Sequence, residues 1–210
     1  MASLNVDLFT DICCPWCFIG TRRLEQALAE VSASADVTIV HRPFLLFPET
    51  PPEGIDIAAM LRQRYGVADA RQAFAPAEAA ALETGFALDL TKQPQAYSTV
   101  AAHTLIRHAD ARGTGRAVAD ALYVAHFIVA KNVSQPDVLA DVAEAHGFTP
   151  DETRRIVQDQ RELKLTRDEA NRAGALGIRG VPHAMLNGMT TISGAQPLAV
   201  FRQAIASSLV

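Results

Sequence analysis

The segment Asp11-Ile12-Cys13-Cys14-Pro15-Trp16-Cys17-Phe18-Ile19-Gly20 lies where one backbone pattern gives way to another. Residues 4–9 before it alternate with a period of two, which predicts a strand that ends near Phe9. Residues 15–32 place apolar side chains at i, i+4 and i+7, which predicts an amphipathic helix. Pro15 suits the first turn of that helix, because an N–H group would have no partner there. The sequence therefore predicts that the cysteines lie at the junction of a strand and a helix.

The segments that follow predict a parallel strand pair and then a change of architecture. Residues 37–40 are all β-branched and predict a second strand, and a β-α-β connection implies that the two strands are parallel. Several prolines between residues 43 and 54 indicate an extended crossing. From Ile55 to about Ala175 only helical patterns follow, with Pro76 expected to mark a break between helices. Thr149 is expected to cap a helix that starts at Pro150, and a further helix is expected from Thr166 to Leu176.

The C-terminal part of the chain returns to strand patterns. Asn187-Gly188 separates two short runs, residues 184–186 and 190–192, and this arrangement is a strong hairpin signal. A final helix is expected to start at Pro197. The two ends of the chain therefore supply β-α-β and β-β-α units, which predicts an α/β fold.

The composition argues against several classes of function. Hydrophobic residues make up 49% and charged residues 20% of the 210 residues, which is typical of a globular protein. The formal net charge of −4 argues against electrostatic binding to nucleic acid or to an anionic membrane. The N-terminus has no basic segment followed by an apolar stretch, and no run approaches the roughly 18 apolar residues of a membrane span. We therefore expect a cytoplasmic protein, in which paired cysteines are more often catalytic or metal-binding than structural.

Cys14 and Cys17 are spaced for a reversible disulfide. Residues three apart in a helix have Cβ atoms about 5–6 Å apart, and a disulfide needs about 3.5–4.5 Å, so a small adjustment closes the bond. Cys14 precedes the first helical residue, where free N–H groups and the helix dipole favour a thiolate. The dipole alone lowers a pKa by only about one unit, so N–H···S hydrogen bonds are expected to add the rest. These features predict Cys14 as the nucleophile and Cys17 as the resolving thiol.

Other interpretations of the cysteines and of a distant proline stay open at this point. Zinc usually takes four ligands, but the chain has no second CxxC pair and its six histidines show no HxxxH-type spacing, so redox chemistry is favoured over a metal site. Cys13 has no obvious partner and is interpreted as a small buried hydrophobic residue rather than a regulatory thiol. The Val181–Pro182 peptide bond is expected to be trans on geometry alone, as about 95% of X-Pro bonds are.

In their order along the chain, these motifs resemble the DsbA-type branch of the thioredoxin superfamily. The closest resemblance is to the FrnE-like subfamily, which is related to the 2-hydroxychromene-2-carboxylate isomerases. The resemblance covers nearly the whole chain. The segments that carry it are Cys14-Pro15-Trp16-Cys17-Phe18-Ile19-Gly20, Arg42-Pro43-Phe44, Pro51-Pro52-Glu53-Gly54, residues 178–188 and Ser193-Gly194-Ala195-Gln196-Pro197.

This resemblance implies a thioredoxin fold with a large all-helical insertion. Residues 1–50 and 166–210 would form the thioredoxin-like domain, and residues 51–165 would form the inserted helical domain. The resemblance also implies that the Val181–Pro182 bond is cis and that Pro182 packs beside Cys14, which replaces the expectation from geometry alone. The residues that it implies for a substrate groove are Pro15, Trp16, Val181, Pro182 and His183.

The chain departs from the family pattern at three positions. DsbA and thioredoxin enzymes bury an acid six residues before the first cysteine, where this chain has Leu8; Asp11 is nearer, but we expect it on a loop and leave its role open. DsbA has histidine where this chain has Trp16, so a cationic neighbour of the thiolate is missing and a less oxidising couple is predicted. His183 follows the implied cis-proline and either tunes Cys14 or is a partly exposed residue of the groove.

Three functions are compatible with these observations. The favoured one is dithiol–disulfide exchange on protein or small-molecule thiols, with no cofactor besides the redox-active disulfide and with glutathione as a candidate co-substrate. The second is a glutathione-dependent isomerase or kappa-type glutathione transferase, in which serine usually replaces Cys14. The third is a non-catalytic peptide-binding or chaperone module. Arg22 and Arg23 either meet an anionic substrate or form a solvated helix face. The chain is expected to be a monomer or a homodimer, without nucleic-acid or membrane partners.

Overall fold

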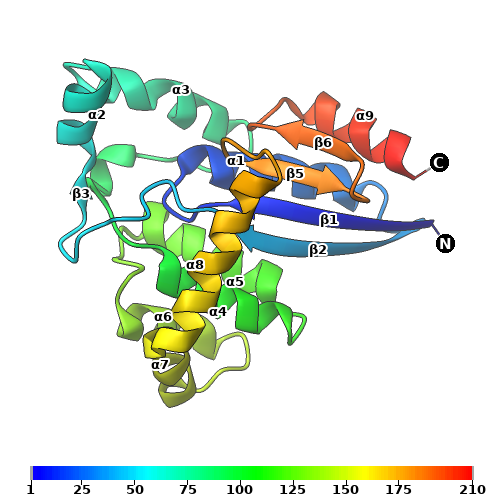
Figure 1. The fold of residues 1–210 in the computed structure, drawn as a ribbon. Coiled ribbons are helices and arrows are strands. Elements are labelled where there is room, and N and C mark those ends of the chain that lie inside the picture. The colour runs from blue at the N-terminus through cyan, green and yellow to red at the C-terminus, as the bar shows by residue number, and fades with distance from the viewer. Residues whose placement is uncertain (1, 210) are drawn as a thin grey trace.

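The computed structural model describes residues 2–209 and contains a mixed four-stranded sheet (Figure 1). The strand order is β2-β1-β5-β6; β1 is parallel to β2 and antiparallel to β5, and β5 is antiparallel to β6. The strands span Ala2–Thr10 (β1), Ala35–Pro43 (β2), His183–Leu186 (β5) and Thr190–Ser193 (β6). The predicted N-terminal β-α-β unit and C-terminal hairpin therefore meet in one sheet.

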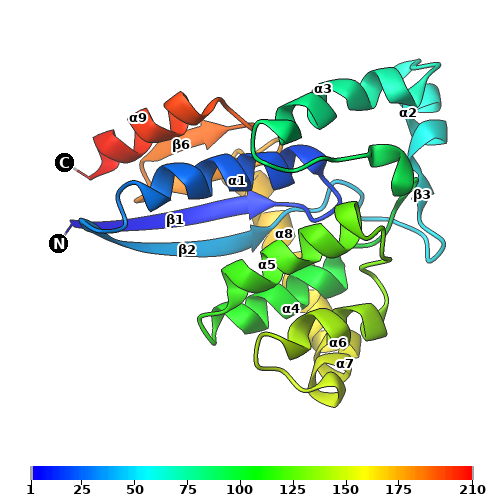
Figure 2. The same ribbon diagram turned by 180° about the vertical axis from the view of Figure 1, so that it is seen from behind.

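Two helices cover one face of this sheet. α1 (Pro15–Ala29) and α9 (Leu198–Ser208) lie side by side along that face in Figure 2. Leu24 of α1 and Phe201 of α9 pack with Leu8 of β1 in one buried apolar core, which we call the sheet core. The period-two pattern of β1 reflects this packing, because alternate side chains of a strand point to the same face.

The segment between β2 and β5 is mostly helical, as expected. Its helices are α2 (Ile57–Tyr65), α3 (Ala70–Leu82), α4 (Val100–Asp110), α5 (Gly115–Tyr123), α6 (Pro136–Glu144), α7 (Pro150–Gln158) and α8 (Gln160–Ala175), with a 3₁₀ turn at Leu90–Lys92 and a π-helical turn at Val124–Ile128. α8 crosses the face of the sheet opposite α1 (Figures 1 and 2). Within residues 2–209, no helix is both long and apolar enough to cross a membrane.

The prediction of purely helical structure in this segment is wrong at one place. Ile55–Asp56 (β3) pairs antiparallel with Gln95–Ala96 (β4). A strand of two residues is too short to show a period of two, and its partner lies far along the chain. The sequence pattern therefore carries no signal for this pair.

Two helix boundaries also differ from the prediction. Pro76 lies inside α3 instead of at a break, with its ring exposed. A proline inside a helix removes one backbone hydrogen bond, and the burial of Ala81 about one turn later helps to offset that loss. α8 begins at Gln160 instead of near Thr166, because the side chain of Asp159 accepts hydrogen bonds from N–H groups of the first turn. α8 consequently runs across the boundary drawn between the two predicted domains.

The predicted turn and cap signals are confirmed. Thr149 Oγ1 accepts a hydrogen bond from the Glu152 N–H at 3.2 Å, as expected for the start of α7. Asn187 and Gly188 are the central residues of the turn that the Met189 N–H to Leu186 C=O hydrogen bond closes, and their φ values of 49° and 69° are left-handed, as a type I′ turn requires. The α/β fold class with its helical insertion is confirmed as well.

A second apolar core fills the helical segment and reaches the start of α1. Cys17 and Phe18 belong to one cluster with Leu105, Tyr123 and Phe127, which we call the helical core. The Phe18 ring lies 5.4 Å from the Tyr123 ring and 6.2 Å from the Phe127 ring between centroids. The two cysteines of the motif therefore lie where a helix of the sheet layer meets the insertion.

Candidate active site

The turn between β1 and α1 sets the position of both cysteines of the Cys14-Pro15-Trp16-Cys17 motif. Cys14 is the N-cap residue of α1, with extended backbone angles (φ −96°, ψ 113°), and Pro15 is the first helical residue. The Cys14 carbonyl accepts hydrogen bonds from the N–H groups of Cys17 (3.0 Å) and Phe18 (3.2 Å). The predicted helix start is confirmed, and it places Cys17 one turn inside the helix.

The sulfur environments differ from the expected arrangement. All three cysteines are reduced and buried, with exposed fractions of 5% for Cys14 and 0% for Cys17. Among the described residues, no backbone N–H caps the Cys14 side chain, so the expected N–H···S bonds to it are absent from this conformation. The Asp11 N–H donates instead to Cys17 Sγ at 3.4 Å, because a tight turn (Cys14 N–H to Asp11 C=O, 3.0 Å) folds Asp11 back over the helix start.

Burial controls the protonation of two of the thiols. Desolvation raises the pKa of the Cys17 thiol well above its ordinary value, the neighbouring Cys14 raises it further, and the Asp11 N–H opposes the rise. Desolvation and the Asp11 charge likewise raise the pKa of Cys13. Cys17 and Cys13 are therefore protonated in the reduced protein near neutral pH. The burial of Cys13, whose exposed fraction is 8%, agrees with its interpretation as a small buried residue.

Asp11 is a buried carboxylate with three partners, although the sequence left its role open. Its exposed fraction is 1%; Oδ1 accepts a hydrogen bond from Thr99 Oγ1 at 2.6 Å, and Oδ2 accepts one from the Leu46 N–H at 2.7 Å. His103 Nε2 lies 3.5 Å from Oδ1. Burial alone would raise the pKa of Asp11, but His103, Thr99 and the Leu46 N–H together hold it below its ordinary value.

Sequence reasoning missed Thr99 and His103. They lie four residues apart, at the start of α4 and on the first turns of it, and therefore share one helix face. That spacing indicates only that the two side chains are neighbours. It carries no signal that they contact a turn almost ninety residues earlier, since only the packing of the insertion against α1 brings the segments together.

The two distant parts of the predicted site meet through Gly20. The Val181–Pro182 peptide bond is cis. A Cβ atom placed on Gly20 would lie 2.6 Å from Pro182 Cγ, so the proline ring packs directly on the backbone of α1, one turn beyond Cys17. Val181 packs against the apolar cluster that contains both cysteines of the motif. A direct contact between Pro182 and Cys14 stays a prediction.

The remaining groove residues differ in exposure. Trp16 is 39% exposed, whereas Pro15 and His183 are half-buried. The His183 ring packs edge-on against Phe9, with 6.2 Å between centroids, and burial lowers its pKa. His183 is therefore neutral near pH 7, and its influence on Cys14 stays a prediction.

Arg22 and Arg23 have roles that the sequence did not suggest. Arg22 pairs with Glu25 and Asp120, and its guanidinium lies 4.6 Å from the Phe86 ring centroid. Arg23 donates to the Ala195 carbonyl at 2.8 Å and to a Glu83 carboxylate oxygen at 2.7 Å. Neither arginine forms a solvated helix face, and both already have partners within the chain. They connect α1 to neighbouring elements.

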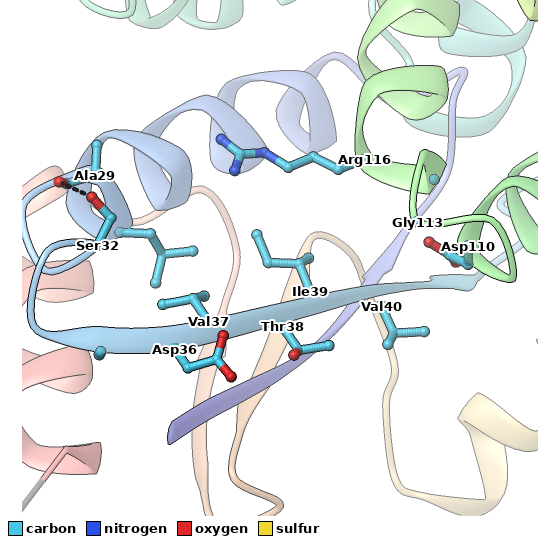
Figure 3. Close-up of a pocket in the computed structure, with 13 residues that line it drawn as sticks. Ala29, Ser32, Asp36, Val37, Thr38, Ile39, Val40, Asp110, Gly113 and Arg116 are labelled. Atoms are coloured by element: carbon cyan, nitrogen blue, oxygen red, sulfur yellow. Dashed lines mark hydrogen bonds between the residues drawn. The ribbon is translucent and has the colours of Figure 1, made fainter. Parts of the chain in front are cut away.

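A pocket of about 660 Å³ lies apart from the motif (Figure 3). Residues 35–40 of β2 line one part of it, with Asp110 at the end of α4 and Arg116 at the start of α5. Arg116 Nε donates to Glu25 Oε1 at 2.7 Å, and burial raises the pKa of Asp110 to about 6 against the opposing charge of Arg42. None of the predicted site residues lines this pocket, so it is separate from the candidate active site.

Among residues 2–209, no three His, Cys, Asp or Glu side chains gather as a metal site would require.

Comparisons with known proteins agree with this geometry. The sequence matches the family model of the DSBA-like thioredoxin domain over residues 5–206. A probable DsbA oxidoreductase from Streptomyces coelicolor is 31% identical, with a TM-score of 0.86 over 98% of this chain and 89% of that chain. Two further structures share the fold at lower identity. The cytosolic disulfide reductase DsbM from Pseudomonas aeruginosa, solved with GSH, is 19% identical (TM-score 0.66; 98% of each chain). A 2-hydroxychromene-2-carboxylate isomerase is 14% identical (TM-score 0.73; 97% of this chain and 95% of that chain).

A search of the curated proteins found no match. The family model spans nearly the whole chain, and the Streptomyces structure agrees in both sequence and fold. The chain therefore belongs to the DSBA-like thioredoxin domain family, as the motifs around Cys14 and Pro182 implied.

Proposed function

We propose that the chain catalyses thiol–disulfide exchange through Cys14 and Cys17. The observation that carries the proposal is the position of the two thiols. Cys14 caps the N-terminus of α1 and Cys17 lies one turn inside it, on a helix whose next turn is packed under Pro182. A helix N-terminus favours a thiolate at the first of these positions, and burial favours a thiol at the second.

The reaction proceeds in two exchanges. The Cys14 thiolate attacks a substrate disulfide, forms a mixed disulfide and releases one substrate thiolate. Cys17 then loses its proton and attacks Cys14 Sγ, which forms the Cys14–Cys17 disulfide and releases the second substrate thiolate. The substrate gains two electrons and the protein loses two, and an external dithiol or glutathione restores the reduced form.

The substrate groove in this proposal consists of the exposed Trp16 ring, Pro15, and the Val181-Pro182-His183 segment. We propose protein disulfides or glutathione disulfide as substrates and the cytoplasm as the location. Support comes from the disulfide reductase relative, which was solved with GSH and is described as cytosolic. A glutathione-dependent isomerase would activate glutathione itself and would not need Cys17. The presence of both thiols favours the redox reaction.

A redox titration tests this function. The protein is equilibrated with glutathione buffers of stepped potential, its free thiols are alkylated, and the species are counted by mass spectrometry. We expect two thiols to disappear together in the wild type, and in a Cys13→Ser variant as well, but not in Cys14→Ser or Cys17→Ser. A wild type that never forms the intramolecular bond would overturn the proposal.

A further inference from the structure

The outer edge of β2 borders the pocket of Figure 3. β2 is the last strand in the order β2-β1-β5-β6, so within the sheet it pairs only with β1. In a parallel pair, successive residues direct their N–H and C=O groups alternately toward the partner strand and away from it. The Phe44 N–H donates to the Thr10 carbonyl at 3.0 Å, so the even-numbered residues of β2 face β1 and the odd-numbered ones face outward. Pro43 lies at an outward position, where its missing N–H removes no bond to β1.

Two residues of this edge keep backbone groups that can pair with another strand. The Ala35 N–H donates back to the turn after α1 at 3.0 Å, and the Asp110 carboxylate accepts a hydrogen bond from the His41 N–H. Within residues 2–209, no hydrogen bond reaches the outward N–H and C=O groups of Val37 and Ile39. Two donors and two acceptors therefore remain, with the two residues about 7 Å apart along the strand. An added strand needs this arrangement.

The pocket of about 660 Å³ gives an added strand a bounded place on this edge. Figure 3 shows the Val37 and Ile39 side chains on the α1 side of β2, and those of Asp36 and Thr38 on the other side. Leu28 of α1 packs in the same apolar core as the first two, so the α1 side of the pocket is apolar. The loop between α4 and α5 forms the far wall. A single extended segment fits between β2 and this loop more readily than a folded domain does.

The charges around the pocket favour a cationic segment. Arg116 is already paired with Glu25, with 2.7 Å between Nε and Oε1. Asp36 is exposed, and it forms no ion pair in the part of the chain that the structure describes. Asp110 adds a second carboxyl group at the other end of the pocket. The charges that remain for a ligand are therefore negative.

Strand pairing places one residue of an added segment opposite Asp36. In an antiparallel addition, one segment residue exchanges both backbone hydrogen bonds with Ile39, and the residue two places later does so with Val37. Both of these side chains point to the apolar α1 side. The following residue lies opposite Asp36 in a non-hydrogen-bonded pair, where side chains of two strands come closest. A lysine or arginine at that position would meet the carboxylate.

We propose that the edge of β2 at Val37 and Ile39 is a docking site for an extended segment of a partner protein. The segment has two apolar residues separated by one residue and followed by a basic residue. Its backbone extends the sheet by one strand, and its basic side chain pairs with Asp36. α1 connects this site to the cysteine motif, and the 11 residues from Cys17 to Leu28 span only about 16 Å. A docked partner is therefore held near the redox pair while the groove beside Trp16 stays open.

A second copy of this chain is the poorer occupant of the same edge. If β2 paired with β2 of another copy in this register, Val40 would lie opposite Asp36, and the carboxylate would gain no cation. The arginine of the strand, Arg42, already forms ion pairs with Asp7 and Glu169 at 2.7 and 3.2 Å. The edge therefore matches a cationic segment better than it matches itself.

A fluorescein-labelled peptide of sequence Gly-Val-Thr-Val-Lys-Gly, amidated and free of cysteine, is the probe. We expect a saturable rise in its fluorescence anisotropy with a Kd below about 1 mM. In NMR spectra of the nitrogen-15-labelled protein, the amide signals of Val37 and Ile39 should shift and the indole signal of Trp16 should not. N-methyl groups on both valines of the peptide remove the N–H groups that face β2, and should weaken binding at least about tenfold.

A charge exchange tests the position of the basic residue. Asp36→Lys should weaken binding of the lysine peptide about five- to tenfold, and should favour a peptide with glutamate in place of lysine. Glu144→Lys makes the same change of charge at an exposed position at the end of α6, outside the pocket, and should alter neither affinity. Circular dichroism checks that both variants fold, and the N-methyl control needs only the wild-type protein.

Three results would overturn the inference: no saturable binding, equal binding of the N-methylated peptide, or shifts confined to the Trp16 groove. A free protein that light scattering shows to be a dimer, and that the peptide converts to monomers, would assign the edge to a second copy and overturn it as well. None of these results bears on the proposed exchange reaction, because its residues do not lie on this edge.

Discussion

We expect the residue at position 16 to influence how strongly the proposed redox pair oxidises other thiols. Its indole carries no formal charge, and the Cys14 side chain receives no hydrogen bond from the first turn of α1 in the described residues. A reduced form that is not stabilised by charge or hydrogen bonds gives a less oxidising couple. We therefore predict a potential below the roughly −120 mV of DsbA.

Substitution at this position tests the argument directly. Trp16→His introduces an imidazole beside Cys14 and should raise the potential, whereas Trp16→Phe keeps an uncharged ring and should leave it close to the wild-type value. Both are measured by equilibration with glutathione buffers. A wild-type potential as high as that of DsbA, or equal potentials for the two variants, would contradict the prediction.

At the scale of elements, the packing of α1 against the segment before β5 depends on a missing side chain. A Cβ atom on Gly20 would lie 2.6 Å from Pro182 Cγ and 3.4 Å from Ala195 Cα, and neither a proline ring nor backbone moves easily. We predict that Gly20→Ala lowers the free energy of unfolding by about 1–3 kcal/mol, because overpacking forces the elements apart.

A second glycine provides the matched control. Gly174 lies in α8 and is exposed, and a Cβ atom placed on it would have no neighbouring atom within 4 Å. Gly174→Ala should stabilise the protein by up to about 1 kcal/mol, because alanine is the better helix former. Urea unfolding of both variants is the measurement. Equal effects at the two glycines would mean that the contact with Pro182 does not constrain α1.

The elements that could be predicted from sequence are those with a local signal. Four such signals come from residues close together in the sequence, and all four are confirmed: the period of β1, the proline at the start of α1, the cap at Thr149 and the Asn187-Gly188 turn. Contacts between distant segments gave no such signal. The β3–β4 pair, and the contact of Asp11 with Thr99, arise only when the insertion packs.

The same distinction between local signals and distant contacts applies to the residues of the candidate site. The two cysteines and Pro182 follow from short motifs, and the resemblance adds their relation to each other. The roles of Arg22 and Arg23 could not be predicted, because Asp120, Glu83 and Ala195, which hold them in place, lie far away in the sequence. The burial of Asp11 could not be predicted either, because it depends on distant residues such as Thr99 that cover the loop.

At the scale of the whole molecule, two buried histidines make stability depend on pH. His41 and His126 are neutral in the folded chain because burial lowers their pKa values to about 4. The unfolded chain binds more protons between about pH 6.5 and 4, so the free energy of unfolding falls as the pH falls through that range. Each histidine contributes at most about 3 kcal/mol to this fall. Asp110 opposes it, because burial raises its pKa to about 6 and the folded chain then binds the extra proton.

Urea unfolding at pH 7 and at pH 4.5 measures this dependence. We expect the wild type to lose several kcal/mol, and His126→Leu to lose less between the same two values. His146→Gln is the control, since this histidine lies in a partly exposed turn. A pH dependence that is identical in the wild type and in His126→Leu would contradict the argument.

The helical core has a consequence for any attempt to shorten the chain. Cys17 and Phe18 share their apolar surroundings with Leu105, Tyr123 and Phe127, all of which belong to the insertion. The insertion therefore supplies part of the apolar packing that buries Cys17. A shortened protein that contained only the sheet, α1 and α9 would keep its cysteines, but Cys17 would lose the apolar neighbours that exclude water from it.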